Sequence, residues 1–472
     1  MSPKLYLEAR KQQLHDEVMI DGSPYFPYLN VQIPDAAACV DNNNDDDDDD
    51  DCEVFKGSMQ SIIARSFFSS SDVTEKDPAL WTVTKITGGN TNQLYCISGM
   101  NKSSSGKKNN KNKNSIPNSV LVRIFGAEGM IDRDVETSTY SSLAKQGLAL
   151  KYYGRFGNGR MEEMLIGWKT LTEEDMMISQ ISDEIARQLA ILHTTYVVPD
   201  HLIEYHDTRI EGGAQPTLWT QLYPWLERAL QDQQQQQFKN EYDTDRVSKL
   251  QPSLATLKQE IDWLKLRIID PNSSIGFCHN DLLASNIMMK NTNTCTTTTT
   301  SDNNNNNNNN NNGNNGNNNN ESNDSIVFSN GAAPTLQFID YEYGGINYYS
   351  YDIANHFNEY AGGTAEEDNS TPNYERRPSK EQQIKFIESY VKEYNNSNET
   401  DTNATTVTVN DIFTEVNGFI LANHLVWGLW GILQASSEGC EDGLDYIQYA
   451  KCRFDQYRSD KQKYLSTSTN LN

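Results

Sequence analysis

The sequence predicts an α+β protein with a small β-rich N-terminal lobe and a larger, mostly helical C-terminal lobe. Three observations lead to this prediction. Short apolar runs separated by glycine-containing turns fill residues 81–165, a helical periodicity runs through residues 182–193, and an apolar run of helical length covers residues 418–435. With 472 residues, the chain is long enough for one large two-lobed protein. The expected divisions are a partly disordered N-terminal extension at 1–60, the first lobe at 61–168 and the second lobe at 169–465.

The first lobe is predicted to contain a small sheet and one helix. Residues 81–98 read as a strand, a Gly-Gly-Asn turn and a second strand. Residues 120–125, VLVRIF, form a short apolar strand with one basic residue inside it. Residues 132–147 predict a helix that ends at its glycine, and residues 151–165 predict a hairpin with a Gly-Asn-Gly turn at 157–159.

The second lobe is predicted to be helical apart from two short strands. The segment SDEIARQLAILH has apolar residues at positions 185, 189 and 192 after Ser182, which we interpret as the N-cap of an amphipathic helix. The short apolar runs at 275–278 and 336–339 are predicted strands.

The apolar run 418–435 has the length of a membrane span but carries polar residues within it. These are Asn423, His424 and Gln434. Because ionisable and amide side chains are costly in a bilayer, we expect a buried core helix and no stable membrane insertion.

Charge and cysteine content narrow the classes of partner and compartment. The formal net charge is −26 and the pI is about 4.6, whereas binding to nucleic acid needs a basic face. We expect no nucleic-acid partner, and small cationic ligands are favoured instead. The seven cysteines are scattered without a Cys-x-x-Cys pair, and the N-terminal residues are too charged for a secretory signal, so we expect a cytoplasmic protein.

Low-complexity inserts interrupt the chain between the predicted elements. Such segments bury too little apolar surface to offset their ordering entropy, so we expect loops there. The inserts lie at 41–51, 101–119, 233–237, 291–325, 362–380 and 395–410.

The strongest local signal is a pair of apolar runs that each end in acidic residues. In GFCHNDLLASNIMM, at 276–289, Asp281 follows the run and Asn286 comes five residues later. In LQFIDYEYG, at 336–344, Asp340 follows the second run. Phosphoryl transfer needs a carboxylate that accepts the proton of the attacking hydroxyl and oxygen ligands that hold Mg²⁺. These segments supply both.

These segments resemble the choline/ethanolamine kinase family, whose relatives include aminoglycoside phosphotransferases and, more distantly, protein kinases. Other segments occur in the order that the family shows. They are GGNTNQLY at 88–95, VLVRIFG at 120–126, IDRDVE at 131–136, YDIANHFNEYAG at 351–362 and HLVWGLWGILQA at 424–435. The resemblance extends over residues 80–460 and implies a bilobal protein-kinase-like fold that binds ATP in its cleft.

The resemblance implies roles for individual residues. Asp281 is the expected catalytic base, and Asn286 and Asp340 are the expected Mg²⁺ ligands. Glu342 is expected to be a second-metal or supporting carboxylate, although a structural role stays open. His279 is expected to brace the loop.

For the nucleotide, the resemblance implies a phosphate-covering turn and a cation on the neighbouring strand. The turn consists of Gly88, Gly89, Asn90, Thr91 and Asn92. Glycine lets backbone amides approach phosphate closely, although Gly-Gly-Asn alone is also an ordinary hairpin turn. Arg123 would contact the phosphates, with Glu136 on the following helix as its ion-pair partner. The segment AEGM at 127–130 is shorter than in the family, which leaves the placement of Glu136 open.

The implied substrate is an amino alcohol, whose cationic end needs aromatic faces and a carboxylate. The residues at the matching positions are Tyr343, Glu359, Trp427, Trp430, Tyr446 and Tyr449. The two tryptophans, three residues apart on an apolar helix, could also be core residues. Asp352 and Asn355 are expected to brace the loops by hydrogen bonds.

The residues after the His-Asn-Asp motif favour ethanolamine over choline. Leu282, Leu283 and the segment FNEYAG at 357–362 are similar to ethanolamine kinases, and Tyr360 stands where choline kinases tend to have Trp. A primary ammonium donates three hydrogen bonds, so its pocket depends less on a complete aromatic cage. The implied activity is phosphorylation of ethanolamine to phosphoethanolamine, the first step of phosphatidylethanolamine synthesis by the CDP-ethanolamine route. Choline kinase and an aminoglycoside-type phosphotransferase are the alternatives, and a homodimer stays open.

Two other readings are disfavoured by specific residues. A protein kinase would carry D-F-G followed by A-P-E, an H-R-D arginine and a V-A-I-K lysine, and none is present. A catalytically inactive binding protein on the same scaffold would not need Asp281, Asn286 and Asp340 together.

Overall fold

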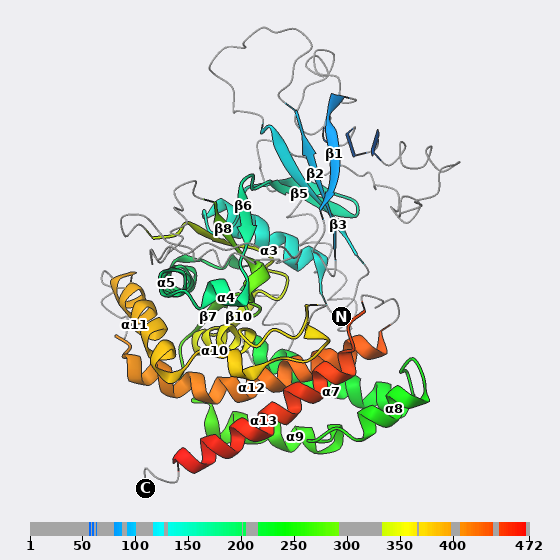
Figure 1. Cartoon of the computed structure of the whole chain (residues 1–472), viewed down its shortest axis with the longest axis vertical. Coiled ribbons are helices and arrows are strands. Elements are labelled where there is room, and N and C mark those ends of the chain that lie inside the picture. The colour runs from blue at the N-terminus through cyan, green and yellow to red at the C-terminus, as the bar shows by residue number, and fades with distance from the viewer. Residues whose placement is uncertain are drawn as a thin grey trace, which may run out of the picture.

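The structure, a computed structural model, confirms the prediction of a two-lobed α+β fold. Figure 1 shows a β-sheet lobe at one end of the long axis and a helical lobe at the other. The described residues are 56–57, 59–60, 63, 80–86, 92–100, 117–126, 131–200, 202–203, 216–291, 333–365, 368–397, 406–437 and 443–468.

The N-terminal lobe is a five-stranded antiparallel sheet with one helix against it. The strand order is β1-β2-β3-β5-β4. The elements are β1 (Thr82–Ile86), β2 (Asn92–Ser98), β3 (Ser119–Phe125), α3 (Arg133–Lys145), β4 (Tyr152–Phe156) and β5 (Gly159–Glu163). The strand pair before residue 100, the apolar strand and the hairpin with the Gly-Asn-Gly turn are all confirmed.

Helix α3 begins and ends at the residues that the sequence indicates. The carboxylate of Asp132 accepts hydrogen bonds from the amides of Asp134 and Val135, which caps the first turn. Gly147 follows the helix with a φ of +77°, a conformation that glycine adopts at little cost.

The C-terminal lobe surrounds two small sheets with helices. One sheet pairs β10 with β7, and the other has the order β6-β8-β9. The strands are β6 (Trp168–Thr170), β7 (Ile275–Cys278), β8 (Ile287–Lys290), β9 (Leu336–Phe338) and β10 (Gly345–Tyr348). The helices are α4 (Glu173–Met176), α5 (Ser179–Thr195), α7 (Thr217–Gln234), α8 (Glu241–Ser248), α9 (Leu254–Trp263), η3 (Leu264–Ile268), η4 (Ala284–Asn286), α10 (Tyr349–Glu359), η7 (Tyr374–Arg376), α11 (Lys380–Ser397), α12 (Val409–Ser436) and α13 (Tyr446–Ser468).

Helix α5 begins earlier than the sequence predicts. Ile178, not Ser182, is the N-cap residue, and its carbonyl accepts hydrogen bonds from the amides of Ile181 and Ser182. Ile181 is fully buried one turn before Ile185, so the apolar face extends one turn further towards the N-terminus. The predicted apolar positions 185, 189 and 192 are buried as expected.

Helix α12 is the core helix that the apolar run predicted. It is long and apolar enough to cross a membrane, yet 89% of its most apolar stretch of 18 residues is buried within the protein. Its polar residues find partners on neighbouring helices. Asn423 donates to Oδ1 of Asn355 at 2.7 Å, and Nε2 of His424 lies 3.2 Å from Oδ2 of Asp460. A helix that is apolar on all sides is stable inside a core.

The predicted lobe boundary at 168/169 falls at the start of β6. This strand pairs with β8, so it belongs to the C-terminal lobe. At the other predicted boundary, Met59 and Ile63 are buried, and the side-chain amide of Gln60 donates to the carbonyl of Trp81 at 3.1 Å. Apart from four residues between 56 and 60, the predicted extension lies outside the described residues.

Strands β8 and β9 are antiparallel neighbours, with Ile287 paired to Phe338. The two strands therefore form a hairpin, and the insert at 291–325 falls between them, as expected. Almost all of that insert lies outside the described residues. The insert leaves both flanking strands paired.

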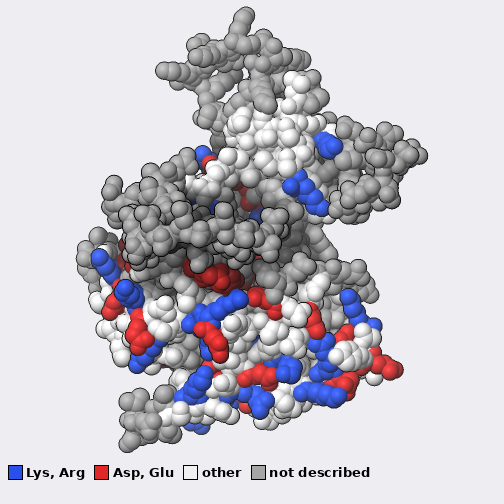
Figure 2. Space-filling model, in the orientation of Figure 1, with Lys and Arg blue, Asp and Glu red and all other residues white. Residues whose placement is uncertain are grey.

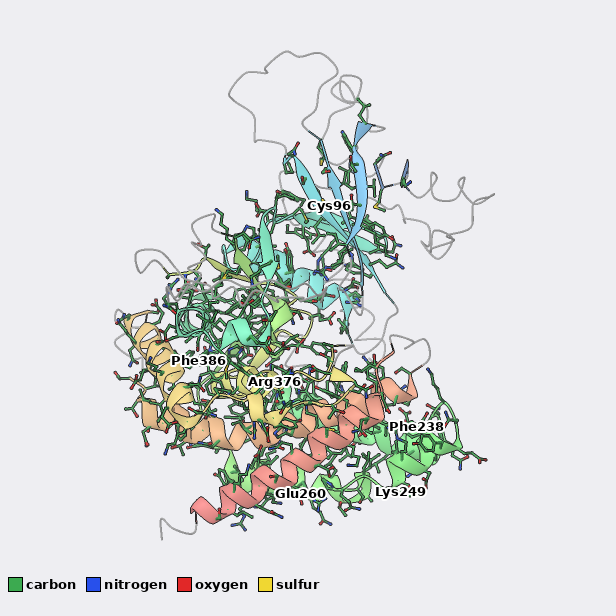
Figure 3. All side chains as sticks on the ribbon, viewed as in Figure 1. Cys96, Phe238, Lys249, Glu260, Arg376 and Phe386 are labelled. Carbon is green, nitrogen blue, oxygen red and sulfur yellow. The ribbon has the colours of Figure 1, made fainter. Side chains whose placement is uncertain are left out.

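The described surface and cysteines can be followed in two further views. On the face drawn in Figure 2, basic and acidic side chains alternate over the helical lobe. Among the described cysteines, Cys96, Cys278 and Cys452 are free thiols. Figure 3 places Cys96 in the sheet lobe and the buried Phe386 on α11 of the helical lobe.

Candidate active site

Two pairs of antiparallel strands bring the two acidic segments together. Strand β7 pairs with β10, and β8 pairs with β9, so the segment before Asp281 and the segment around Asp340 lie side by side. The amide of Ile339 donates to the carbonyl of Asn286 at 2.9 Å, which joins the ends of the two segments. The side-chain amide of Asn286 donates to the carbonyl of Asp281 at 2.9 Å and to its Oδ2 at 3.3 Å. The predicted base and one predicted ligand are therefore in contact.

A hydrogen bond and unusual backbone conformations mark the region around His279 and Asp340. Nε2 of His279 lies 2.9 Å from the carbonyl oxygen of Ile339, which ties the two segments together, as the bracing role predicted. Burial lowers the pKa of His279, so its ring is neutral. Asn280 and Asp340 both have a φ of +64°, an uncommon conformation for residues other than glycine that the surrounding contacts must hold.

The electrostatics of Asp281 suit a proton acceptor. Burial, followed by the carboxylates of Glu359, Glu342 and Asp340, raises the pKa of Asp281 well above its ordinary value. A carboxylate with a raised pKa is a stronger base, and such shifts are typical of catalytic groups.

A group of carboxylates beside Asp281 has the spacing of a metal site. Oxygens of Glu136, Asp340 and Glu342 lie within 4.8 Å of one another. Oδ1 of Asp340 is buried and has no hydrogen-bond partner among the described residues. Burial, with the charges of Asp340 and Glu136, raises the pKa of Glu342 to about 7. A hard divalent cation would satisfy the orphaned oxygen and relieve this repulsion, so these residues fit Mg²⁺.

The predicted ion pair between Arg123 and Glu136 is wrong. Nε of Arg123 donates to Oε1 of Glu162 at 2.9 Å, because β3 lies beside β5, which carries Glu162. Glu136 instead accepts hydrogen bonds from Arg160 at 2.7 Å and from Arg133 at 2.8 Å. Although burial raises the pKa of Glu162, Arg123 and Arg160 hold it down to about 2, so this group is ionised.

Arginines link the first lobe to the acidic segments of the second. Nη1 of Arg123 lies 4.0 Å from Oδ2 of Asp340, and Nη1 of Arg133 donates to Glu342 at 3.3 Å. Both arginines are buried. Arg123 is therefore positioned beside the carboxylates that would hold a metal.

The predicted phosphate-covering turn is mostly outside the described residues. This applies to Gly88, Gly89, Asn90 and Thr91. Asn92 is described: it is buried at the start of β2, opposite Phe125 of β3.

The predicted substrate residues form one aromatic cluster. Trp430 stands at its centre, with ring centroids 5.6 Å from Trp427, 5.5 Å from Tyr446 and 5.9 Å from Tyr449. Tyr343 lies 5.4 Å from Trp427, and its hydroxyl accepts a hydrogen bond from the Trp430 indole at 2.9 Å. Edge-on contacts between aromatic rings thus connect residues 340–344 to α12 and α13. These residues, which include Asp340 and Glu342, are here called the metal segment.

Glu359, the predicted carboxylate partner of the substrate, has a partner that sequence reasoning missed. Nη2 of Arg453 donates to Oε1 of Glu359 at 2.6 Å and to the hydroxyl of Tyr449 at 2.7 Å. Arg453 is fully buried on α13. Within the described part of the chain, Oε2 of Glu359 makes no hydrogen bond, so one oxygen is available to a ligand.

The contacts of Tyr360 and a nearby cavity clarify the surroundings of the site. Tyr360 packs against His356 and donates to the carbonyl of Met176 at 3.0 Å, so its described contacts lie away from the aromatic cluster. A cavity of about 50 Å³ adjoins the metal segment between α3 and α7. Its lining includes Asp132, Glu136, Gln221, Trp225, Glu342 and Tyr343.

Asp352 and Asn355 act as braces, as expected. Asp352 accepts the amides of His279 and Asn280, and Asn355 accepts the indole N–H of Trp427 at 2.7 Å. Helix α10 therefore supports both the loop that contains His279, Asn280 and Asp281 and the aromatic cluster.

Comparison with known proteins agrees with the fold and the motifs. The family model described as choline/ethanolamine kinase matches residues 83–458. The chain is 30% identical over 354 residues to "Probable choline kinase 2" of Arabidopsis thaliana, covering 74% of this chain and 79% of the relative. It is 30% identical over 384 residues to ethanolamine kinase 1 of Mus musculus, covering 81% and 84%. A solved ethanolamine kinase of Plasmodium vivax has the same fold, with a TM-score of 0.59 at 22% identity over 87% of this chain and 90% of that chain.

Proposed function

The chain belongs to the choline/ethanolamine kinase family, and from this premise we propose that it transfers the γ-phosphate of ATP to the hydroxyl of ethanolamine. The product would be phosphoethanolamine, made in the cytoplasm for phosphatidylethanolamine synthesis. The observation that carries this proposal is the charge environment of Asp281, because the carboxylates of Glu359, Glu342 and Asp340 all raise the pKa of its side chain.

Asp281 is proposed to accept the proton of the substrate hydroxyl. Asn286 holds the loop in place through its contacts with the carbonyl and the carboxylate of Asp281. Because little covalent chemistry is needed for phosphoryl transfer, such positioning supplies much of the rate.

Arg123 and the carboxylate group are proposed to hold the nucleotide with its metal. Asp340 and Glu342 would bind Mg²⁺ with Asn286, and Glu136 lies near enough to contribute an oxygen. Bound Mg²⁺ would neutralise phosphate charge. Arg123 would contact the phosphates beside Asp340, which its distance of 4.0 Å from that carboxylate allows.

The substrate ammonium is proposed to lie between Glu359 and the aromatic cluster. Arg453 occupies Oε1 of Glu359 and leaves Oε2 for the ligand. A primary ammonium can donate a hydrogen bond to that oxygen, whereas a trimethylammonium cannot. This difference supports ethanolamine as the substrate.

Choline is the second candidate because of one observation. The ring centroid of Trp430 lies within 6 Å of those of Trp427, Tyr446 and Tyr449, and aromatic faces attract quaternary ammonium groups. A choline kinase would use this cluster more than Glu359.

A coupled ADP-release assay with Mg-ATP tests the proposal. The acceptors are ethanolamine, choline and a panel of aminoglycosides at matched concentrations. We expect kcat/KM for ethanolamine to exceed that for choline by about tenfold or more, which corresponds to about 1.4 kcal/mol of transition-state binding. A higher kcat/KM for choline would transfer the assignment to choline, and activity on aminoglycosides alone would refute both. Fractionation of cells, followed by detection of the protein, tests the cytoplasmic location.

A further inference from the structure

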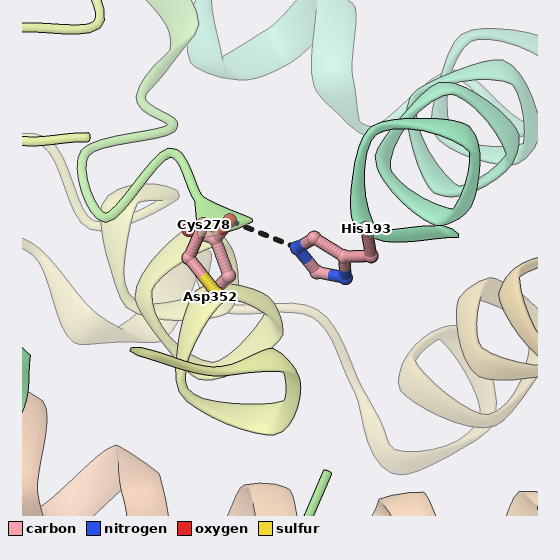
Figure 4. A group of neighbouring side chains, drawn as sticks. All are labelled: His193, Cys278 and Asp352. Atoms are coloured by element: carbon pink, nitrogen blue, oxygen red, sulfur yellow. Dashed lines mark hydrogen bonds and ion pairs between the residues drawn. The ribbon is translucent and has the colours of Figure 1, made fainter. Parts of the chain in front are cut away.

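A buried group formed by His193, Cys278 and Asp352, shown in Figure 4, adjoins residues 279–281, here called the catalytic loop. Their ligand atoms lie within 4.8 Å of one another, a spacing that a metal ion would accept. However, both ring nitrogens of His193 and both oxygens of Asp352 already have hydrogen-bond partners. The thiol of Cys278 donates to the carbonyl of Tyr348 at 3.4 Å. The group is therefore a hydrogen-bonded unit and not a vacant set of ligands.

Asp352 connects this unit to the two residues that precede Asp281. Its Oδ2 accepts the amide of His279 at 2.7 Å, and its Oδ1 accepts the amide of Asn280 at 2.8 Å. Hydrogen bonds to an ionised acceptor are stronger than those between neutral groups. One buried carboxylate thus fixes two consecutive peptide groups of the catalytic loop.

The loop needs such support because of the conformation of Asn280. Its φ of +64° is unfavourable for a residue with a Cβ atom. Its side-chain amide donates to the carbonyl of Tyr343 at 2.9 Å, and its Oδ1 accepts from Asn347 at 2.8 Å. If the contact with Asp352 weakens, Asn280 can relax and carry the adjacent Asp281 with it.

His193 is the residue that orients Asp352. Its Nε2 lies 3.1 Å from Oδ2 of Asp352, and its Nδ1 lies 2.8 Å from the hydroxyl of Tyr390. Since a carboxylate can only accept, Nε2 carries the hydrogen and Nδ1 accepts from Tyr390. The ring of His193 also stacks on Tyr349, with centroids 4.4 Å apart and planes at 12°. The imidazole therefore has one orientation and one tautomer.

We propose that His193 is a positioning residue that, through its Nε2–H, holds Asp352 against the amides of residues 279–280 and so places the carboxylate of Asp281. Helices α5 and α11 thereby contribute to the geometry of a loop that neither of them contains. The inference rests on the proposed role of Asp281 as the base.

Two substitutions of His193 separate its two hydrogen bonds. His193→Gln places an amide nitrogen near the position of Nε2, so it keeps the bond to Asp352 and loses the bond to Tyr390. His193→Asn places its amide near the position of Nδ1, so it keeps the bond to Tyr390 and loses the bond to Asp352. Tyr390→Phe is the matched control, because it removes the same bond as His193→Gln and leaves the imidazole in place.

The variants are compared by steady-state kinetics, thermal unfolding and hydrogen–deuterium exchange of the full-length protein. His193→Asn should lower kcat about 10- to 100-fold with both KM values within about twofold of wild type, since a misplaced base affects the reaction step. Exchange in peptides that cover residues 275–290 should become faster. His193→Gln and Tyr390→Phe should keep kcat within about threefold, even where their melting temperatures fall.

Two results would overturn the inference. One is an equal loss of kcat in His193→Asn and His193→Gln, and the other is unchanged exchange at 275–290 in His193→Asn. The exchange measurement does not depend on substrate identity. A wild-type protein that is inactive on amino alcohols would instead refute the proposed function, so the two failures are distinguishable.

Discussion

The buried pair of Arg453 and Glu359 offers a test in which stability and substrate binding separate. Nη2 of Arg453 donates to Oε1 of Glu359 at 2.6 Å, and the side chains are 0% and 7% exposed. Removing one member of such a pair leaves an unpaired charge in the interior, which costs about 3–5 kcal/mol. Arg453→Met should therefore lower the free energy of unfolding by about that amount.

A double variant, Glu359→Gln/Arg453→Met, shows whether the loss of stability comes from the unpaired charge or from lost packing. Replacing both members by neutral groups of similar size is often nearly neutral for stability. Glu359→Gln/Arg453→Met should thus recover most of the loss and unfold within about 1–2 kcal/mol of wild type. Its KM for ethanolamine should stay at least about tenfold above wild type, as in Glu359→Gln alone, because a neutral amide binds ammonium less well than a carboxylate.

Urea unfolding at fixed pH and steady-state kinetics supply the two measurements. The kinetics are run for ethanolamine and for ATP, and the KM for ATP serves as the internal control. The reasoning is refuted if the double variant is as unstable as Arg453→Met, since the loss would then come from packing. It is equally refuted if Glu359→Gln leaves the KM for ethanolamine unchanged.

Three further predictions concern the base, the nucleotide and pH. Asp281→Asn should lower kcat by about two to four orders of magnitude with nearly unchanged ATP binding, measured by kinetics and by calorimetry with a non-hydrolysable analogue. Arg123→Met should raise the KM for ATP about tenfold or more, because it removes a buried cation 4.0 Å from Asp340. Burial lowers the pKa values of His356 and His424 from 6.5 to about 4, so the unfolded chain binds their protons first as the pH falls. The contribution of each histidine to the free energy of unfolding is therefore complete above about pH 6.5. Towards pH 4 the free energy of unfolding falls by about 3 kcal/mol for each histidine, which urea unfolding at several pH values would detect.

Much of the fold could be predicted because its signals are local. The hairpin at the Gly-Asn-Gly turn, the cap of α3 at Asp132 and the apolar core helix α12 each depend on neighbouring residues in the sequence. The start of α5 was placed too late because a serine with acidic residues after it resembles a cap. The burial of Ile181, which depends on tertiary packing, extends that helix by one turn.

The residues of the candidate site divide in the same way. Asp281 and Asp340 follow short apolar strands and Asn286 comes five residues after Asp281, so all three could be found from the sequence around those strands. The partner of Arg123 could not, because Glu162 comes 39 residues later on a strand whose place in the sheet the sequence does not specify. Arg453 is 94 residues from Glu359, and nothing around it distinguishes it from a surface arginine of α13.

The charges of the site connect its separate parts. Glu359 beside the aromatic cluster and Glu342 beside Asp340 both raise the pKa of Asp281, so each carboxylate makes ionisation of the base more costly. A cation bound beside either one lowers that cost. Because coupling between binding sites is reciprocal, the amino alcohol and the metal–nucleotide should each favour binding of the other. Asp281, the proposed base, is then most readily ionised when both proposed substrates are bound, which is the state in which it has a proton to accept.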